Sequence, residues 1–163
     1  GEGQNQSPYG WTKSKNTELV KNYGDWFDLD FAIAYFYNAY GAREISSGKY
    51  STLVAIFIEK MRKGEPLTVV LPGSQQRNFT HVEDIVNGLI IVSEKGKGDG
   101  YGIGNDKSYT IIELAEMFGG EIEYLPERKG NRLTAELVTE KTKKLGWYAK
   151  NNIEDYIKGL GFG

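Results

Sequence analysis

The chain has 163 residues, a length typical of one domain and sufficient to bury a sizeable core. Its net charge of −2 argues against a role at nucleic acids or membrane surfaces. The lack of cysteine excludes disulfides and a cysteine nucleophile, and a single histidine, His81, excludes multi-histidine metal sites. No apolar run is long enough to span a bilayer, so a cytoplasmic protein is expected.

The first predicted element is a helix that starts near Pro8 and carries Tyr9 and Lys13 on one face. Proline suits the first turn of a helix, and side chains four residues apart share a face. A positive charge beside a phenol stabilises the phenolate, so this pair suits a tyrosine that acts as a base. With 11 tyrosines in the chain, about one such spacing is expected by chance, and the alternative is an exposed helix face without chemistry.

A nearly continuous apolar and aromatic run over residues 29–37 follows this helix. Such a run is typical of a strand that is buried on both faces, as in a parallel sheet covered by helices. The strand ends in the polar loop 38–41. In open α/β sheets ligands bind at the carboxyl ends of the strands, so this loop is a candidate binding region.

The next part of the chain continues the alternation between helix and strand. Residues 52–63 carry apolar side chains at helical spacing, with Ser51 as the expected N-cap and Gly64 as the stop signal. A short β-branched strand over 67–71 follows, and then a polar stretch over 75–81 that lacks periodicity. The order predicted here is therefore helix, strand and loop.

Two capping boxes predict the starts of two further helices. Thr80 with Glu83 opens a helix that runs to about Glu94, and Thr110 with Glu113 opens one that ends before Gly119. The remaining predicted elements are short strands at 101–104 and 121–125 and helices at 139–145 and 153–160.

Because strand and helix patterns alternate along the whole chain, the predicted fold class is α/β. The number of strands is low for a self-sufficient doubly wound sheet. A strongly apolar strand such as 29–37 needs neighbours on both sides, and the chain does not obviously contain them.

Six short motifs, in order and at matching spacing, resemble the extended short-chain dehydrogenase/reductase family, and within it the NAD-dependent nucleotide-sugar epimerases and dehydratases. Ser-Pro-Tyr-Gly-Trp-Thr-Lys at 7–13 resembles the Tyr-x-x-x-Lys helix of that family. Phe-Tyr-Asn-Ala-Tyr-Gly at 36–41 resembles its Asn-x-Tyr-Gly strand end, and 76–84 resembles its Arg-Asp-Phe-x-His-Val-x-Asp signature. The remaining matches lie at 101–104 with 113–115, at 126–130 and at 145–147.

The chain also departs from the family pattern. The family often has an arginine where Tyr35 stands and a proline where Ala42 stands, and Asn131 replaces an aspartate that is common after Arg-x-Gly. The larger departure is the lack of the Gly-rich dinucleotide-binding turn with which the family begins. We therefore expect a truncated protein, a fragment or half of a split protein, and a chain that is inactive on its own.

The resemblance implies the C-terminal part of an extended Rossmann-type fold, without the N-terminal dinucleotide-binding half. Residues 1–45 are expected to hold the end of the parallel sheet and the Tyr-x-x-x-Lys helix. Residues 46–163 are expected to form mainly a small α/β substrate domain, with room for segments that return to the sheet.

The resemblance also assigns roles to residues near the start of the chain. Tyr9 is the expected catalytic base and Lys13 its electrostatic partner, and both are expected to contact the cofactor, NAD. The backbone of Tyr37 is expected to lie close to the nicotinamide, and Asn38 is expected to contact the substrate. The alternatives are a core aromatic for Tyr37 and a turn residue for Asn38.

Arg77 and Arg128 each lie in a predicted loop within a family motif. Guanidinium groups bind phosphate oxygens bidentately, so both are expected to bind the diphosphate of a nucleotide sugar. The alternative is a pair of surface arginines. A structural role is expected for His81, and no metal site is expected.

The function that the resemblance implies is the NAD-dependent interconversion of a nucleotide sugar through a 4-keto intermediate. We expect 4-epimerisation of a UDP-sugar, with a nucleotide-sugar 4,6-dehydratase as the alternative within the family. The alternative outside it is an inert fragment or a partner-binding remnant. A homodimer, formed through the helix of Tyr9 and Lys13, is expected for the full-length protein.

Overall fold

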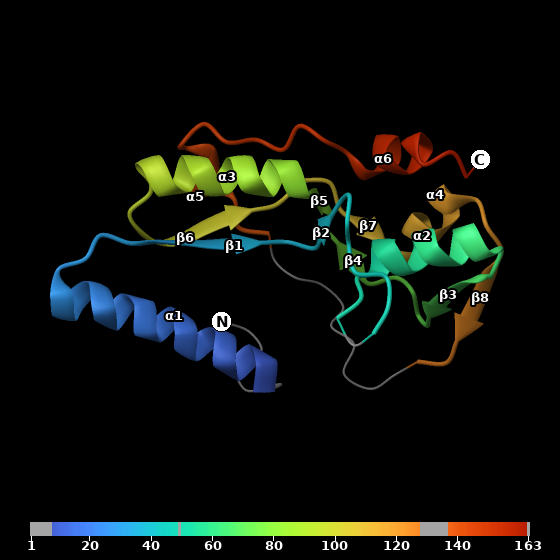
Figure 1. Cartoon of the computed structure of the whole chain (residues 1–163), viewed down its shortest axis with the longest axis horizontal. Coiled ribbons are helices and arrows are strands. Elements are labelled where there is room, and N and C mark those ends of the chain that lie inside the picture. Colours follow the sequence, from blue (N-terminus) through green and yellow to red (C-terminus); the bar gives the residue numbers. More distant parts are fainter. Residues whose placement is uncertain (1–7, 49, 128–136, 163) are drawn as a thin grey trace.

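A computed structural model of the chain describes residues 8–48, 50–127 and 137–162. In one part of the molecule, β1 (Ala32–Phe36) pairs in parallel with β6 (Gly98–Ile103). The helix α3 (Val82–Lys95) packs on one face of this pair (Figure 1). Strand 98–103 thus returns from late in the chain to lie beside the first strand.

A second group of elements holds the larger hydrophobic core. There β3 (Leu67–Val70) pairs in parallel with β8 (Ile122–Leu125). The helices α2 (Leu53–Lys63) and α4 (Ile111–Phe118) lie on this pair and on each other, and α6 (Ile153–Gly159) packs on α4 (Figure 1). Helical spacing brings the apolar side chains of α2 to one face, and the buried ones are Val54, Ala55, Phe57 and Ile58.

Two very short strand pairs lie between these groups. The strand β2 (Ala39–Tyr40) pairs in parallel with β5 (Thr80–His81). The strand β4 (Gln76–Arg77) pairs in antiparallel fashion with β7 (Tyr109–Thr110). The short helix α5 (Glu140–Lys143) contacts β6. The predicted α/β class with parallel strands is confirmed.

The first helix, α1 (Pro8–Phe27), lies apart from both cores, on the other side of β1 and β6 from α3 (Figure 1). It continues through Gly24 to Phe27, and none of its residues is buried. The helix runs in the opposite direction to β1, so its N-terminal end lies toward the carboxyl end of that strand (Figure 1).

The prediction that strand 29–37 is buried on both faces is wrong for the described chain. The strand is shorter, and Tyr35 and Phe36 are 41% and 56% exposed. The physical reason is that β1 has one strand neighbour, β6, and one covering helix, α3, among the described residues. An apolar strand sequence indicates that both faces of the strand favour burial, but it does not show which helices or strands cover them.

The predicted capping signals have mixed outcomes. The capping box of Thr110 and Glu113 is confirmed, and Gly64 ends α2 in the left-handed conformation with φ of 67°. The N-cap of α2 is Thr52 rather than Ser51. The capping box predicted at Thr80 is also wrong, because the hydroxyl of Thr80 is used in a tertiary contact described below.

Candidate functional site

The candidate site is the end of the sheet where the parallel strands β1 and β6 both finish. The loop after β1 begins with Tyr37 and Asn38, and the loop after β6 holds Gly104, Asn105 and Asp106. Parallel strands bring their carboxyl ends to one edge, so these polar loops lie together.

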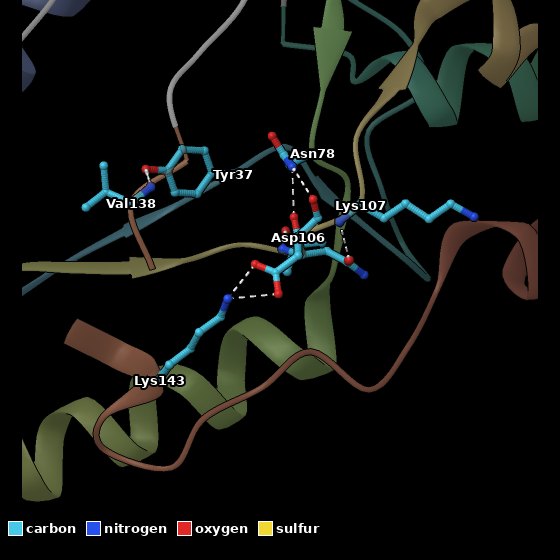
Figure 2. A network of polar contacts seen from close by, with 8 residues as sticks. Tyr37, Asn78, Asp106, Lys107, Val138 and Lys143 are labelled. Atoms are coloured by element: carbon cyan, nitrogen blue, oxygen red, sulfur yellow. Dashed lines mark hydrogen bonds and ion pairs between the residues drawn. The ribbon is translucent and has the colours of Figure 1, made fainter. Parts of the chain in front are cut away.

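Asn78 connects the two loops. Its side-chain Nδ2 donates hydrogen bonds to the carbonyl oxygens of Asn105 (2.9 Å) and Asp106 (3.4 Å) (Figure 2). Its own carbonyl accepts from Nδ2 of Asn38 at 3.2 Å. The backbone of Asn38 is held as well, because its carbonyl accepts from the N–H of Thr80 at 3.2 Å. Asn38 is therefore fixed through both its side chain and its backbone.

The conformation of Asn38 is unusual for a residue with a side chain. Its φ is +35°, in the left-handed region that asparagine tolerates better than most residues. The side chain is exposed, and within the described ranges its Oδ1 accepts no hydrogen bond. An amide oxygen held in this way can accept a hydrogen bond from a ligand hydroxyl without further ordering of the side chain.

A chain of hydrogen bonds continues from this site to a buried carboxylate. Asn105 donates its backbone N–H to Thr80 Oγ1 (3.1 Å) and its Nδ2 to the carbonyl of Asn151 (3.1 Å). The Nδ2 of Asn151 donates to Oδ1 of Asp84 at 3.1 Å. The Oδ2 of Asp84 accepts from the backbone N–H groups of Lys150 (3.1 Å) and Asn151 (2.9 Å). Because Asp84 is only 1% exposed, it anchors this polar chain inside the molecule.

The loop after β6 is also tied to α5. The Nζ of Lys143 lies 2.7 Å from Oδ1 and 2.8 Å from Oδ2 of Asp106 (Figure 2). The hydrogen bond to Asp106 raises the pKa of Lys143 above its ordinary value. The Oδ1 of Asn105 accepts from the backbone N–H of Lys107 at 3.0 Å, which closes the turn. The loop is thus held on several sides.

Tyr37 contacts a segment from late in the chain. Its hydroxyl accepts a hydrogen bond from the backbone N–H of Val138 at 3.3 Å (Figure 2). This segment crosses β6 very closely, since a Cβ on Gly102 would lie 1.8 Å from the carbonyl oxygen of Val138. Glycine is needed at that crossing. The side chain of Tyr37 is partly buried here, and its predicted proximity to a nicotinamide stays a prediction.

Tyr9 and Lys13 belong to the N-terminal half of α1, the half that lies toward the carboxyl end of β1 (Figure 1). The Nζ of Lys13 lies 5.7 Å from the centre of the Tyr9 ring, so the pair predicted to share a helix face does so. Tyr9 is 73% exposed and, within the described ranges, makes no hydrogen bond to the strand-end loops. The structure brings Tyr37, Asn38 and Asn78 together and leaves Tyr9 accessible on the neighbouring helix.

The two predicted diphosphate ligands have different outcomes. Arg77 lies on β4 directly before Asn78, with its Nη1 2.8 Å from the carbonyl of Gln76, and is therefore next to the site. Arg128 lies outside the described residues. His81 caps α3, since its Nδ1 accepts from the N–H of Glu83 at 3.3 Å, which supports the structural role expected of it.

Three residues of the site were not singled out from the sequence: Asn78, Asn105 and Asp84. Asn78 and Asp84 lie within the motif at 76–84, in which the sequence predicted a ligand contact for Arg77. Asn105 directly follows a predicted strand, and a polar residue at a strand end is the one signal that could have identified it. Their roles depend on contacts between distant segments, which local patterns do not reveal.

A separate apolar groove of about 330 Å3 lies at the other end of α1. Its lining residues are Leu19, Val20, Tyr23, Gly24, Leu29, Asp30 and Phe31. Such a lining does not suit a charged nucleotide sugar. In the part of the chain that the structure describes, no cluster of three or more acidic or histidine side chains could hold a metal ion. None of the described helices combines the length and hydropathy needed to cross a membrane.

Comparisons with known proteins agree on one family. Residues 1–104 match the model of the NAD dependent epimerase/dehydratase family. The low-salt glycan biosynthesis protein Agl12 of Haloferax volcanii is 31% identical over 161 residues, which cover 94% of this chain and 51% of that protein.

Solved structures give the same picture. The UDP-glucose 4-epimerase of Thermotoga maritima with UDP-glucose superposes with a TM-score of 0.87 and 29% identity, over 96% of this chain and 53% of that one. The UDP-glucose 4-epimerase of Thermus thermophilus in complex with NAD gives 0.81 and 26%, over 93% and 52%. The chain therefore spans about half the length of the relatives that it matches.

Proposed function

Because the chain belongs to the NAD dependent epimerase/dehydratase family, we propose that it forms the substrate-handling part of an enzyme that interconverts nucleotide sugars through a 4-keto intermediate. The substrate that we propose is a UDP-sugar and the reaction 4-epimerisation. The observation that carries the proposal is that Tyr9 and Lys13 share one face of α1, whose N-terminal end lies toward the carboxyl end of β1, the strand that Asn38 follows (Figure 1).

The described residues fit one end of NAD. The exposed Tyr9 hydroxyl and the Lys13 ammonium are hydrogen-bond donors of the kind that bind ribose hydroxyls. The glycines between 98 and 104 belong to a strand, β6, and not to a strand-to-helix turn that could bind a pyrophosphate. When bound, NAD supplies a hydride acceptor and donor for C4 of the sugar.

In the proposed mechanism Tyr9 acts as the base. Its phenolate takes the proton of the C4 hydroxyl as the 4-keto sugar forms, and it returns that proton when the hydroxyl is restored. The ammonium of Lys13 stabilises the phenolate electrostatically. Asn38 accepts a hydrogen bond from the sugar through its free Oδ1, and Arg77 binds the diphosphate as a bidentate donor. Arg128 is proposed as a second donor to the diphosphate.

A homodimer through α1 is proposed as well. Support comes from its exposed apolar side chains, among which Trp11 and Leu19 are 53% and 50% exposed. Aromatic and aliphatic side chains of this kind are enriched in the cores of dimer interfaces. A single sedimenting species at the monomer mass over a wide concentration range would contradict the dimer.

Binding to the 163-residue chain tests the proposed site. Side-chain amide signals of the 15N-labelled chain are followed by NMR while UDP-glucose is added. We expect the amides of Asn38 and Asn78 to shift in a saturable way, and glucose alone at the same concentration to leave them unchanged. Saturable shifts confined to other surfaces, with both amides unaffected, would contradict the site.

A further inference from the structure

The orientation of α1 depends on few contacts, because none of its residues is buried. At its C-terminal end, Gly24 packs against Phe31: a Cβ on that glycine would lie 2.4 Å from the Phe31 ring. The carbonyl of Gly24 also accepts from the N–H of Leu29 at 3.2 Å. These contacts fix where the helix leaves the sheet, and they leave its rotation about its own axis to be set by other side chains.

Asp99 of β6 makes the polar contact between α1 and the sheet. Its Oδ2 lies 2.5 Å from Nζ of Lys21 on α1. Its Oδ1 accepts a hydrogen bond from the hydroxyl of Tyr35 on β1 at 2.8 Å. Burial raises the pKa of Tyr35, and the side chain of Thr17, one helical turn before Lys21, lowers it. A single carboxylate thus joins α1, β1 and β6.

The backbone of β6 is irregular at this position. The register of the β1–β6 pair shifts between Ala32 and Ala34, so β6 has an extra residue there. Gly98 and Gly100, on either side of Asp99, have φ of +75° and +97°, which only glycine adopts readily. The carbonyl of Asp99 accepts from Nζ of Lys141 at 2.6 Å. This bulge is a local feature that presents Asp99 to α1.

The contact residues of α1 are in a fixed relation to the predicted catalytic pair. Tyr9, Lys13, Thr17 and Lys21 follow one another at intervals of four residues. Each step of four turns the side chain by about 40° around the helix axis, so a rotation at Lys21 moves Lys13 and Tyr9 by the same angle.

We infer that Asp99 is a positioning residue, which sets the rotation of α1 through Lys21 and thereby the direction in which Tyr9 and Lys13 point. The hydroxyl of Tyr35 completes the contact by donating to the same carboxylate. An arginine at position 35 would be a cation and would compete with Lys21 for Asp99. This inference rests on the proposed function for its consequence in catalysis, but the contact can be tested without turnover.

The test measures the placement of α1 directly. Because the chain has no cysteine, two spin labels can be attached at introduced cysteines, Asn16→Cys on α1 and Lys95→Cys at the end of α3, both exposed. Pulsed electron paramagnetic resonance then gives the distribution of distances between α1 and the sheet. We expect a narrow distribution in this parent, and a several-fold larger population at other distances in Asp99→Ala and Lys21→Met.

Control variants separate the contact from general helix stability. Lys15→Met removes a lysine whose ion pair with Glu18, at 2.6 Å, stays within α1, so it should leave the distribution unchanged. The charge exchange Lys21→Glu with Asp99→Lys should restore the narrow distribution. The side chain of Lys21 is 46% exposed, so Lys21→Met gives an answer even if Asp99→Ala does not fold.

The titration of Asp99 provides a second readout. Burial alone would raise the pKa of this carboxyl, but hydrogen bonds from Lys21, Tyr35 and the N–H of Gly100 outweigh it and hold the pKa below the ordinary 3.8. Asp99 therefore contributes fully to holding α1 against the sheet above pH 3.8, and this contribution is lost as the pH falls through the lowered pKa. The groups that face Asp99 are Lys21, Tyr35 with Thr17, Gly100 and, at its carbonyl, Lys141. NMR of the carboxyl carbon should show a higher pKa in Lys21→Met.

The outcomes are distinct. A distance distribution in folded Lys21→Met that matches the parent, with an unchanged Asp99 pKa, would overturn the inference whatever the activity. A broadened distribution without any effect on turnover would leave the contact in place and contradict the proposed role of Tyr9 instead. In an active protein, Lys21→Met should lower kcat and leave KM nearly unchanged, because it disturbs the base rather than binding.

Discussion

The side-chain amide of Asn38 donates a hydrogen bond of 3.2 Å to the backbone carbonyl of Asn78, and so joins two loops that are 40 residues apart in the sequence. The donor is used within the protein, and the amide oxygen accepts no hydrogen bond from the described residues. A substrate contact at Asn38 therefore depends on Asn78, and through it on the loop after β6.

Substitution of Asn38 should separate its backbone role from its side-chain role. Asn38→Ala places a Cβ at a φ of +35° without the local bonding of asparagine, whereas Asn38→Gly adopts this φ without strain. We expect the alanine variant to be less stable than the glycine variant by about 1 kcal/mol, and both to bind UDP-glucose more weakly. Urea unfolding measures the first effect and calorimetric titration the second. Equal stability of the two variants would argue against a strained backbone at this position.

The buried carboxylate of Asp84 should be important for stability. In Asp84→Ala the backbone N–H groups of Lys150 and Asn151 lose the carboxylate that accepts their part-buried hydrogen bonds. We expect the free energy of unfolding to fall by at least about 1.5 kcal/mol, because a hydrogen bond to a charged group contributes about 1.5–3 kcal/mol. Asp25→Ala, on the exposed face of α1, is the control and should change it little. A loss below about 1 kcal/mol for Asp84→Ala would mean that the 147–151 segment is held by other contacts.

Tyr9→Phe tests the proposed base. The change removes only the hydroxyl of a side chain that is 73% exposed, so the unfolding transition of the chain should not move. Turnover of nucleotide sugar by an active protein that contains this chain should fall by about 10²-fold or more, since positioned proton transfer contributes about that factor. Tyr23→Phe, another exposed tyrosine on α1, is the matched control. Similar turnover in both variants would remove Tyr9 from the mechanism.

Arg77→Ala tests the proposed diphosphate contact. Loss of a charge-assisted, bidentate donor should weaken binding of the nucleotide sugar by about 1.5–3 kcal/mol, and lysine should restore only part of it. KM should carry more of the effect than kcat. Arg62→Ala, an exposed arginine at the end of α2, is the control. Normal binding in Arg77→Ala would refute the contact at Arg77. For Arg128, which lies outside the described residues, the same loss of binding is predicted.

Much of the fold could be predicted from local patterns. The strand 67–70, the helix 53–63 with its glycine stop and the capping box at Thr110 are each determined by residues within one element. The spacing of Tyr9 and Lys13 likewise predicted a shared helix face, and the motif order predicted the family. These features are encoded over a few consecutive residues, so the sequence alone reveals them.

The remaining features depend on contacts between distant segments. Thr80 has the spacing of a capping residue, but its hydroxyl accepts from the N–H of Asn105, and His81 caps the helix instead. The same applies to Asp99, whose contact with Lys21 requires that β6 return beside β1. Local bonding competes with tertiary bonding for such side chains, and the sequence around one residue does not show which partner prevails.

Turnover is the most direct test of the proposed function. The chain is fused to the half of the Thermotoga maritima UDP-glucose 4-epimerase that it does not match, and the folded protein is given NAD and UDP-glucose. NMR of the sugar anomeric region identifies the product. We expect UDP-galactose, formed about 10²-fold or more slowly in Tyr9→Phe, while a 4-keto-6-deoxy sugar would assign the chain to the dehydratases of the family. A folded fusion that binds both NAD and UDP-glucose and forms neither product would contradict the proposed function.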